Sequence, residues 1–293
     1  MNRGRRPTLL RISVLHPSHT PRMSARRALP WVHDVQDALT TDRFGRRIRS
    51  FERIGSTNTE AVAWARDGAR EGSLVVADYQ TEGRGRHGRQ WTADPGTNLM
   101  VSVVLRPHMM PERLGLITLA ASVAVADTID AFVRPHRTAI KWPNDILLEG
   151  RKTCGMLLEG TFAGRPRTND VPAFVILGVG MNVNQTNFPD ALADTATSLH
   201  LVLGRPVPRK PLFARLLREL EQRYDSLAED GGAGVRTAFH ARMDRLGDRA
   251  TLRFTGTDET ISGTVRGVTE TGALRLDTAD GPATVHAGEV TSQ

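Results

Sequence analysis

The sequence predicts an α+β protein, in which a mixed β-sheet with helices is followed by a small C-terminal β-barrel of SH3-like size. Apolar strands and helices alternate irregularly up to about residue 246, without the strand–helix order of a doubly wound parallel sheet. After Gly247 the sequence changes to short alternating strands separated by glycine-containing turns. We therefore expect an arginine-rich, disordered leader over residues 1–49, a main domain over residues 50–246 and a C-terminal domain over residues 247–293.

The first helix of the main domain should begin near Ser56, because Thr57 and Glu60 have the spacing of a capping box. Apolar periodicity, a proline at a helix start and the continuous apolar run at 173–183 predict the elements that follow. In order these are strands at 73–80 and 98–105, a helix over Pro111–Phe132, strands over Thr138–Trp142, Ile146–Leu148, Cys154–Phe162 and Ala173–Val183, and helices over Pro211–Ala228 and Val235–Arg245. The C-terminal strands are expected over Ala250–Phe254, Thr260–Val268, Ala273–Asp277 and Thr284–His286.

The excess of positive over negative charge in this chain comes from residues 1–50. Residues 1–50 carry eleven arginines against three aspartates, and the rest carries 28 basic against 29 acidic residues, out of a net charge of +7. Arg3 to Arg27, with several prolines, is expected to be disordered and lacks the apolar core of a secretory signal. A tail that touches RNA or a membrane, and a true start at Met23 rather than Met1, both remain open.

The composition excludes several classes of protein. No apolar run is long enough to span a membrane. The single cysteine, Cys154, excludes an intrachain disulfide framework and cysteine-rich zinc sites, and it fits the cytoplasm. Cys154 lies in an apolar run and is interpreted as a small buried side chain rather than a nucleophile. No helix-turn-helix is recognisable before residue 50, so we expect no specific DNA binding.

The most informative segment is the loop GRGRHGRQW, from Gly83 to Trp91. Glycines let the backbone approach a ligand, and closely spaced arginines are typical of a site for an anion. The glycine spacing matches the dinucleotide-binding fingerprint, but that fingerprint requires a following helix. Here Pro95-Gly96 and a second strand follow, so a Rossmann site is disfavoured. A solvated basic hairpin would account for the arginines but not for the glycines and Trp91.

Four further motifs accompany this loop. Ser56-Thr57-Asn58 offers hydroxyl groups at a helix start. The turn KWPND (141–145) combines a cation, an aromatic ring and a carboxylate, and Arg151-Lys152 precedes the next strand. The run GVGMNVN (178–184) interrupts the central strand with glycines, which weaken a strand unless something approaches it closely.

Taken together, STN (56–58), YQTEGRGRHGRQW (79–91), KWPND (141–145), RKTCG (151–155) and GVGMNVN (178–184) closely resemble the biotin protein ligase family. The resemblance covers about residues 50 to 293. It implies a class II synthetase-like catalytic domain, with an SH3-like C-terminal domain. It also implies a reaction in two steps, in which biotin and Mg·ATP form biotinyl-5′-AMP and the biotinyl group then passes to a lysine of a biotin carboxyl carrier domain.

The resemblance also assigns the site residues. Arg84, Arg86 and Lys152 would offset the repulsion between the biotin carboxylate and the α-phosphate, with Lys152 the main candidate. For biotin, the matching positions are Ser56, Thr57, Asn58, Gln80, Gly83, Arg84, Gly85, Arg86, Lys152 and Gly155, with the Gly178–Gly180 strand leaving room for the thiophane ring. For ATP they are Arg86, Arg89, Trp91, Lys152 and Asn182. Asp145 would be a base or a Mg²⁺ contact, and His87 is assigned no chemistry.

The resemblance also indicates which cofactors and partners to expect. We expect Mg²⁺ to arrive with ATP rather than in a site of the protein alone, and no bound prosthetic group. The winged-helix repressor domain of some relatives is not recognisable, so we expect a monofunctional cytoplasmic ligase, as a monomer or weak homodimer. A lipoate or octanoate ligase, which has the same fold without this loop, is the alternative enzyme. A biotin-responsive nucleic-acid regulator that uses the basic leader is the alternative of another class.

Overall fold

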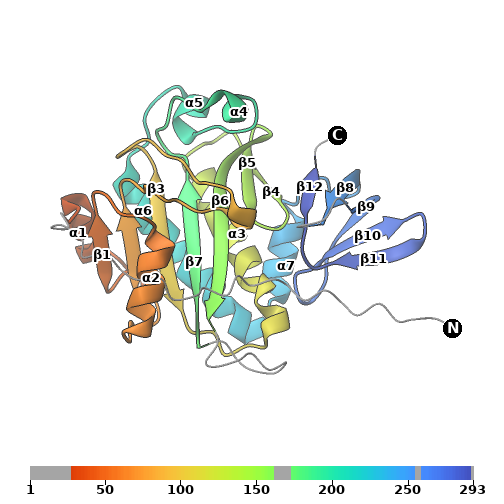
Figure 1. Ribbon diagram of the computed structural model, residues 1–293, viewed down its shortest axis with the longest axis horizontal. Helices are drawn as coiled ribbons and strands as arrows, with labels where there is room; N and C mark the ends of the chain where they lie inside the picture. Colours follow the sequence, from red (N-terminus) through yellow and green to blue (C-terminus); the bar gives the residue numbers. More distant parts are fainter. Residues whose placement is uncertain (1–27, 162–172, 255–258, 292–293) are drawn as a thin grey trace.

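A seven-stranded mixed sheet forms the centre of the main domain in a computed structural model that describes residues 28–161, 173–254 and 259–291 (Figure 1). The strand order is β1-β2-β3-β7-β6-β5-β4. β1 and β2 pair in parallel and all other neighbours are antiparallel, so the predicted mixed sheet is confirmed. The strands are β1 (Ile48–Phe51), β2 (Leu74–Ala77), β3 (Leu99–Leu105), β4 (Thr138–Lys141), β5 (Asp145–Leu148), β6 (Arg151–Thr161) and β7 (Phe174–Met181).

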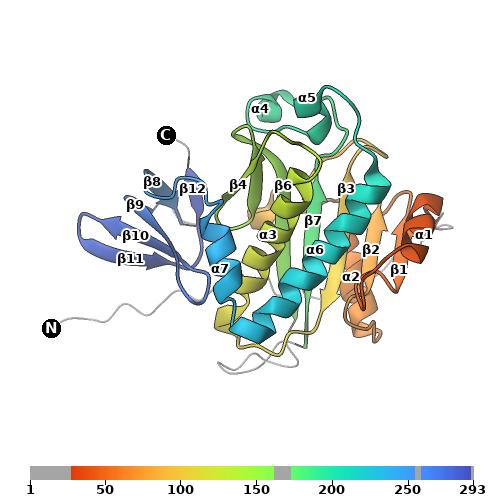
Figure 2. The ribbon, with the colours of Figure 1, turned by 180° about the vertical axis from the view of Figure 1, so that it is seen from behind.

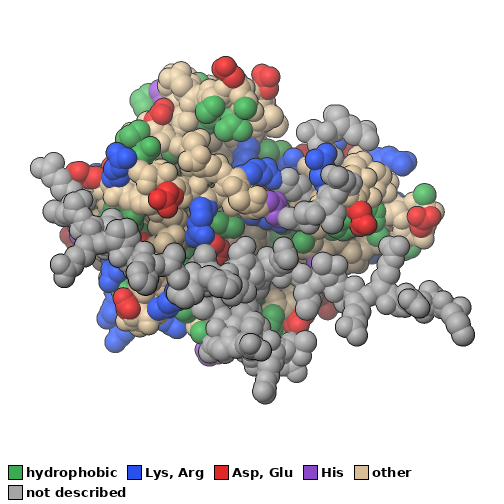
Figure 3. All heavy atoms as spheres, viewed as in Figure 1, with side chains coloured by type: hydrophobic (Ala, Val, Ile, Leu, Met, Phe, Trp, Pro, Cys, Tyr) green, Lys and Arg blue, Asp and Glu red, His purple; other side chains and the backbone are tan. Residues whose placement is uncertain are grey.

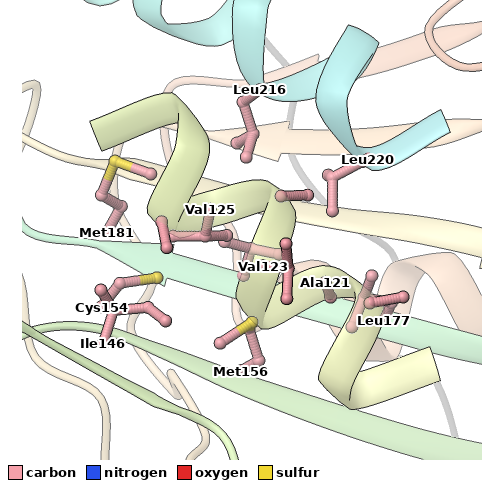
Figure 4. Close-up of a cluster of buried hydrophobic side chains, with 14 of the residues drawn as sticks. Ala121, Val123, Val125, Ile146, Cys154, Met156, Leu177, Met181, Leu216 and Leu220 are labelled. Atoms are coloured by element: carbon pink, nitrogen blue, oxygen red, sulfur yellow. The ribbon is translucent and has the colours of Figure 1, made fainter. Parts of the chain in front are cut away.

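Three helices cover the back of this sheet, α3 (Gly115–Asp130), α6 (Arg209–Asp230) and α7 (Ala233–His240) (Figure 2). α3 and α6 lie side by side over the back of the sheet, and most side chains of α3 are buried, as its apolar sequence predicts. Figure 4 shows Val123 and Val125 of α3 packed against Cys154 and Met156 of β6. Among the described helices none is long and apolar enough to cross a lipid bilayer.

The front of the sheet is only partly covered. α2 (Thr57–Arg66) packs there on a second, smaller core that includes Val75, Val104 and Ile176. Because alternate strand residues face opposite sides, Gly155 and Glu159 of β6 share this front face while Cys154 and Met156 face α3. The front face therefore carries glycines and a carboxylate where the back face carries apolar side chains, and this difference locates the site.

The sequence-based boundary of the leader is wrong for its second half. α1 (Pro30–Asp37) begins on a proline and buries Val32 and Val35 against the main domain. Its Trp31 ring lies 5.7 Å from the ring of Phe213 on α6. The arginine count of residues 1–49 obscured this short amphipathic pattern. The residues predicted to be disordered, Arg3 to Arg27, and the choice between Met1 and Met23 lie outside the described residues.

The predicted helix start near Ser56 is confirmed, but its capping box and the helix start at Pro111 differ from the structure. Ser56 is the N-cap of α2, without a side-chain capping bond, and Thr57 is already helical. Glu60 pairs with Arg49 at 3.0 Å, so the predicted capping box is wrong because both side chains have partners elsewhere. A 3₁₀ turn, η2 (Pro111–Arg113), precedes α3, which begins at Gly115 rather than at the proline. Two short helices that we did not predict, α4 (Asp190–Ala193) and α5 (Leu199–Leu203), lie beyond the end of β7 at the top of Figure 1.

The C-terminal domain is a separate antiparallel sheet at one side of the main domain (Figure 1). Its strand order is β11-β10-β9-β8-β12, and it contacts the KWPND turn, where the Trp142 indole donates a 3.0 Å hydrogen bond to the Gly272 carbonyl. This confirms the predicted change of architecture after Gly247. The strands are β8 (Arg249–Arg253), β9 (Thr260–Val268), β10 (Leu274–Thr278), β11 (Gly281–Val285) and β12 (Glu289–Thr291).

His240 joins the two domains in a way that depends on pH. Its Nε2 accepts a 2.9 Å hydrogen bond from the Val268 backbone N–H, which requires that this nitrogen carry no proton. Burial, and then the charges of Arg236 and Arg275, lower the pKa of His240 below its ordinary value of 6.5. A lowered folded-state pKa gives stability that is present above the unfolded value and is lost as pH falls through the folded value.

We therefore expect the thermal midpoint to fall as pH decreases below about 6.5, with a contribution that a His240→Gln variant removes. The Gln amide oxygen can still accept the Val268 N–H but does not titrate. The measurement is a series of melting curves between pH 8 and pH 5 for both proteins. Identical pH profiles for the two would contradict this role of His240.

Candidate active site

The loop from Gly83 to Trp91 crosses the front of the sheet as a small closed hairpin. Trp91 N donates to the Gly83 carbonyl at 2.9 Å and Gly85 N donates to the Arg89 carbonyl at 2.7 Å, around the 3₁₀ turn η1 (Arg86–Gly88). A Cβ on Gly83 would lie 2.3 Å from the Trp91 carbonyl oxygen, so only glycine fits there. The hairpin is thus a compact unit whose position depends on its contacts with the sheet.

Two arginines fix the hairpin to the main domain. Arg84 Nη2 lies 3.0 Å from Glu159 Oε2 on β6. Arg86 Nη1 donates a 3.0 Å hydrogen bond to Asn144 Oδ1 of the KWPND turn. Asn144 is itself buried, and its Nδ2 donates to the Met156 carbonyl at 2.6 Å. The loop and the turn, which are more than fifty residues apart in the sequence, therefore meet at one site as the motifs predicted.

The Trp91 ring lies on two glycines in neighbouring strands. A Cβ on Gly180 of β7 would be 2.6 Å from the ring, and a Cβ on Gly155 of β6 would be 3.4 Å from it. Gly155 and Gly180 are register partners, so the two bare positions make one flat bed on the front face. We predicted space for a ligand at these glycines and a place near the nucleotide for Trp91. The structure puts the Trp91 ring on this bed.

The polar side chains at the start of α2 form one hydrogen-bonded group. The side-chain amide oxygen of Gln80, Oε1, accepts from Thr57 N at 2.7 Å and from Thr57 Oγ1 at 3.0 Å. Ser102 Oγ lies 2.8 Å from Thr57 Oγ1 and 2.5 Å from Asn58 Oδ1. With its oxygen used in this way, Gln80 retains its NH₂ donors for other contacts. Ser56, adjacent to this group, is also buried.

Gly178 does not provide room for a ligand, which corrects our expectation for that strand. A Cβ there would lie 2.3 Å from Asn58 Oδ1, so the Asn58 side chain fills the space. Asn58 also donates from Nδ2 to Glu159 Oε2 at 2.7 Å. Asn58 therefore supports the site from beneath α2, between β3, β6 and β7.

A cluster of cations surrounds Asp145 at the end of the KWPND turn. Lys152 Nζ lies 2.6 Å from Asp145 Oδ1 and 6.0 Å from the centre of the Trp91 ring. Burial, opposed by Asp145, lowers the pKa of Arg86, and neighbouring Arg89 lowers it further. The pKa of Lys141 is lowered first by burial and also by the charges of Lys152 and Arg245. Positive charge exceeds negative charge here, so an anion would be stabilised.

Figure 3 shows Lys and Arg side chains gathered over the middle of this face, around the loop. Two buried donors at the site, Arg84 Nε and Trp91 Nε1, lack a hydrogen-bond partner among the described residues. Unpaired buried donors are costly in a protein without ligand. The arrangement can therefore bind an anionic group between the loop, the turn and β6.

Some predicted residues lie behind or beside this group. Asn182 is buried, and its Nδ2 donates to the Thr197 carbonyl at 3.1 Å, so it fastens the segment that carries α5. Arg89 is exposed at the far end of the hairpin. Burial raises the pKa of the Cys154 thiol, which faces α3, in agreement with a structural role. A surface hollow of about 810 Å³ lies beside the loop and is lined by none of the predicted site residues; its walls include Arg53, Tyr79, Thr92, Gln185 and Phe188.

No group of three or more His, Cys, Asp or Glu side chains that could hold a metal ion is found within the described ranges. Asp145 is one carboxylate, already paired with Lys152. Mg²⁺ is commonly bound by one or two carboxylates together with substrate phosphates.

Sequence reasoning missed Glu159, Ser102 and Lys141 as members of the site. Lys141 was within the KWPND motif and was not assigned a role. Glu159 and Ser102 lie in apolar strands, where a lone acid or hydroxyl is a signal that a strand face is not packed against a core. That signal could have directed attention to Glu159, which is nearly fully buried.

The family model of the biotin/lipoate A/B protein ligases matches residues 50–182. The model of the biotin protein ligase C-terminal domain matches residues 251–291. Between them the two models cover most of the main sheet and almost all of the C-terminal sheet.

Individual relatives agree with these matches. A biotin–[acetyl-CoA-carboxylase] ligase of Mycobacterium tuberculosis is 36% identical over 250 residues, 84% of this chain and 88% of the relative. A bifunctional ligase/repressor of Bacillus spizizenii is 34% identical over 88% of this chain and 77% of the relative. Among solved structures, the biotin protein ligase of Aquifex aeolicus in complex with biotin and ATP superposes with a TM-score of 0.71, at 25% identity, over 84% of this chain and 98% of that one.

Proposed function

The chain belongs to the biotin/lipoate A/B protein ligase family, and on that premise we propose which residues carry out its reaction. It is an ATP-dependent biotin protein ligase, which activates biotin as biotinyl-5′-AMP and attaches biotin to protein. We propose that the acceptor is one lysine of a biotin carboxyl carrier domain; the Mycobacterium tuberculosis relative is named as a ligase of acetyl-CoA-carboxylase.

The observation that carries this assignment is the cation pair beside the glycine bed. Activation brings a carboxylate against the α-phosphate, so two anions must approach each other. Lys152 lies 2.6 Å from Asp145 and 6.0 Å from the centre of the Trp91 ring, and the charge of Asp145 also acts on Arg86. We propose that these two cations offset that repulsion and stabilise the charge that develops on phosphorus. Leaving pyrophosphate carries further charge, and we propose that Arg89 and Lys141 interact with it.

The biotin site is proposed at the start of α2. A ureido group needs donors and acceptors that are held rigidly within an apolar surrounding. Thr57 and Gln80 are locked to each other, and Gln80 presents its remaining NH₂ donors. Ser56, Asn58 and the backbone of Gly83 and Gly85 are the neighbours that complete this end. The valeryl chain would then run toward Lys152 along the Trp91 ring, which covers Gly155.

We expect biotin-dependent exchange between ATP and pyrophosphate, with lipoate at least about 10³-fold less effective as the acid. The dithiolane ring of lipoate has no groups for the donors of Gln80, so it would leave them unpaired. The measurement compares the rate of exchange, divided by acid concentration, for biotin and lipoate with the same protein. Comparable rates would assign the chain to lipoate chemistry. No exchange with either acid, from folded protein, would contradict adenylation itself.

Four further features are part of this proposal. Mg²⁺ would enter as the Mg·ATP complex, with Asp145 as the single protein carboxylate near its phosphates. The free, buried Cys154 is consistent with a cytoplasmic protein. A monomer or weak homodimer is proposed, without specific DNA binding. The domain division at residues 246–247 is proposed because the two sheets are separate on either side of it.

A further inference from the structure

One buried carboxylate, Glu159, connects the Gly83–Trp91 loop to the sheet. Its side chain is 6% exposed, on the front face of β6. Arg84 Nη2 lies 3.0 Å from Glu159 Oε2, and Asn58 Nδ2 donates to the same oxygen at 2.7 Å. A single carboxylate oxygen therefore receives one donor from the loop and one from α2. Glu159 is assigned no role by the reaction derived above.

The contacts continue from Glu159 to the far end of the biotin site. Asn58 Oδ1 meets Ser102 Oγ, which also meets Thr57 Oγ1, and Thr57 holds Gln80. The path thus runs from Arg84 in the loop to Gln80 at the end of β2 through five hydrogen bonds. Each step joins buried or half-buried side chains, so a change at Glu159 affects both ends.

The cations Lys152, Arg86 and Arg84 differ in the groups that their charges face. Lys152 and Arg86 share the neighbourhood of Asp145, where positive charge is in excess. Arg84 instead faces its own carboxylate, and the Arg84 side chain is only one-third exposed. A cation that is neutralised by a buried partner contributes little field to a ligand, while the pair fixes geometry.

We propose that Glu159 is a positioning residue that latches the Gly83–Trp91 loop onto β6 through Arg84, so that Arg84 acts as the loop anchor and not as a charge for the reacting anions. This inference rests on the proposed biotin site. The latched loop places Trp91 against the Gly155–Gly180 bed and holds Asn58 and Thr57 in their hydrogen-bonded positions. Loss of the latch should weaken biotin binding and expose the loop, while the chemistry at Lys152 and Arg86 is retained.

The first test is Glu159→Gln, which is isosteric and removes the charge. We expect the KM for biotin in the exchange assay to rise about tenfold, with kcat at saturating biotin within about threefold of wild type. Tryptic cleavage after the loop arginines, quantified by mass spectrometry without ligand, should accelerate about tenfold because it follows the open population. The matched control is Glu60→Gln, which removes a buried carboxylate paired with Arg49 at 3.0 Å on α2, away from the loop. This control should leave loop cleavage unchanged.

The second test is Arg84→Gln, alone and combined with Glu159→Gln. If the two residues form one latch, the double variant is no worse than either single variant in biotin KM and in loop cleavage. Additive effects of the two changes, or wild-type loop cleavage in both single variants, would overturn the latch. A fall of about a hundredfold in kcat for Arg84→Gln would assign Arg84 to charge neutralisation instead. Loop cleavage requires no turnover, so the latch remains testable if wild-type protein shows no biotin-dependent exchange, which would contradict only the proposed function.

Discussion

Replacement of Lys152 by alanine is expected to reduce biotin-dependent ATP–pyrophosphate exchange by two to three orders of magnitude, or about 3–4 kcal/mol of transition-state stabilisation. We expect this fall because of where the Lys152 ammonium lies, 2.6 Å from Asp145 and beside Gly155 on β6. Its backbone is fixed by hydrogen bonds with Thr195 and Thr197. The fall should appear mainly in kcat, because the charge that Lys152 meets develops in the transition state.

The control for this variant is Lys210→Ala. Lys210 also pairs with a carboxylate, Asp34, but on an exposed surface between α6 and α1. Loss of such an exposed pair changes stability by less than about 1 kcal/mol and should not change exchange. Lys152→Ala protein that melts like wild type and retains exchange within about threefold would exclude Lys152 from the chemistry. In that case Arg86 would be the next candidate.

The sequence predicted the site better than it predicted the secondary structure at the chain's beginning. The loop and the KWPND turn were identified by unusual local combinations of residues, and Lys152 by the family resemblance. The structure brings the three together. The C-terminal sheet was predicted because strand alternation with period two is visible in short segments. These patterns lie within short segments of the sequence, so they can be recognised without knowledge of the fold.

The features that were missed depend on contacts between distant residues. α1 was hidden within an arginine-rich stretch, and only its packing against α6 distinguishes it from disorder. The missing side chain at Gly178 suggested room for a ligand. The side chain of Asn58, a residue 120 positions earlier in the chain, fills that room. Glu159 pairs with Arg84 across 75 positions. No periodicity within β6 could indicate which partner a buried acid has.

Gly178→Ala is expected to destabilise the protein by about 2–4 kcal/mol, which combines overpacking with the loss of a buried hydrogen bond. The added Cβ would lie 2.3 Å from Asn58 Oδ1 and 3.0 Å from Asn58 Cγ, well inside contact distance. Asn58 cannot move freely because Glu159 and Ser102 both hold it. The melting temperature should fall by about 5–10 °C. The biotin KM should rise as well, because displacement of Asn58 disturbs Thr57.

A double-mutant cycle with Asn58→Ala separates this clash from a general intolerance of β7 to a side chain. Without the Asn58 amide, the Gly178→Ala Cβ meets no atom at 2.3 Å, so its cost in that background should be small. The coupling between the two substitutions should therefore be about 2 kcal/mol and favourable in sign. Gly55→Ala is the reference for a harmless change, because its Cβ would be 3.7 Å from the Glu82 carboxylate. Equal destabilisation by Gly178→Ala with and without Asn58 would show that the glycine is needed for the strand itself, and the support that Asn58 gives to the site would then have to come from Glu159 and Ser102 alone.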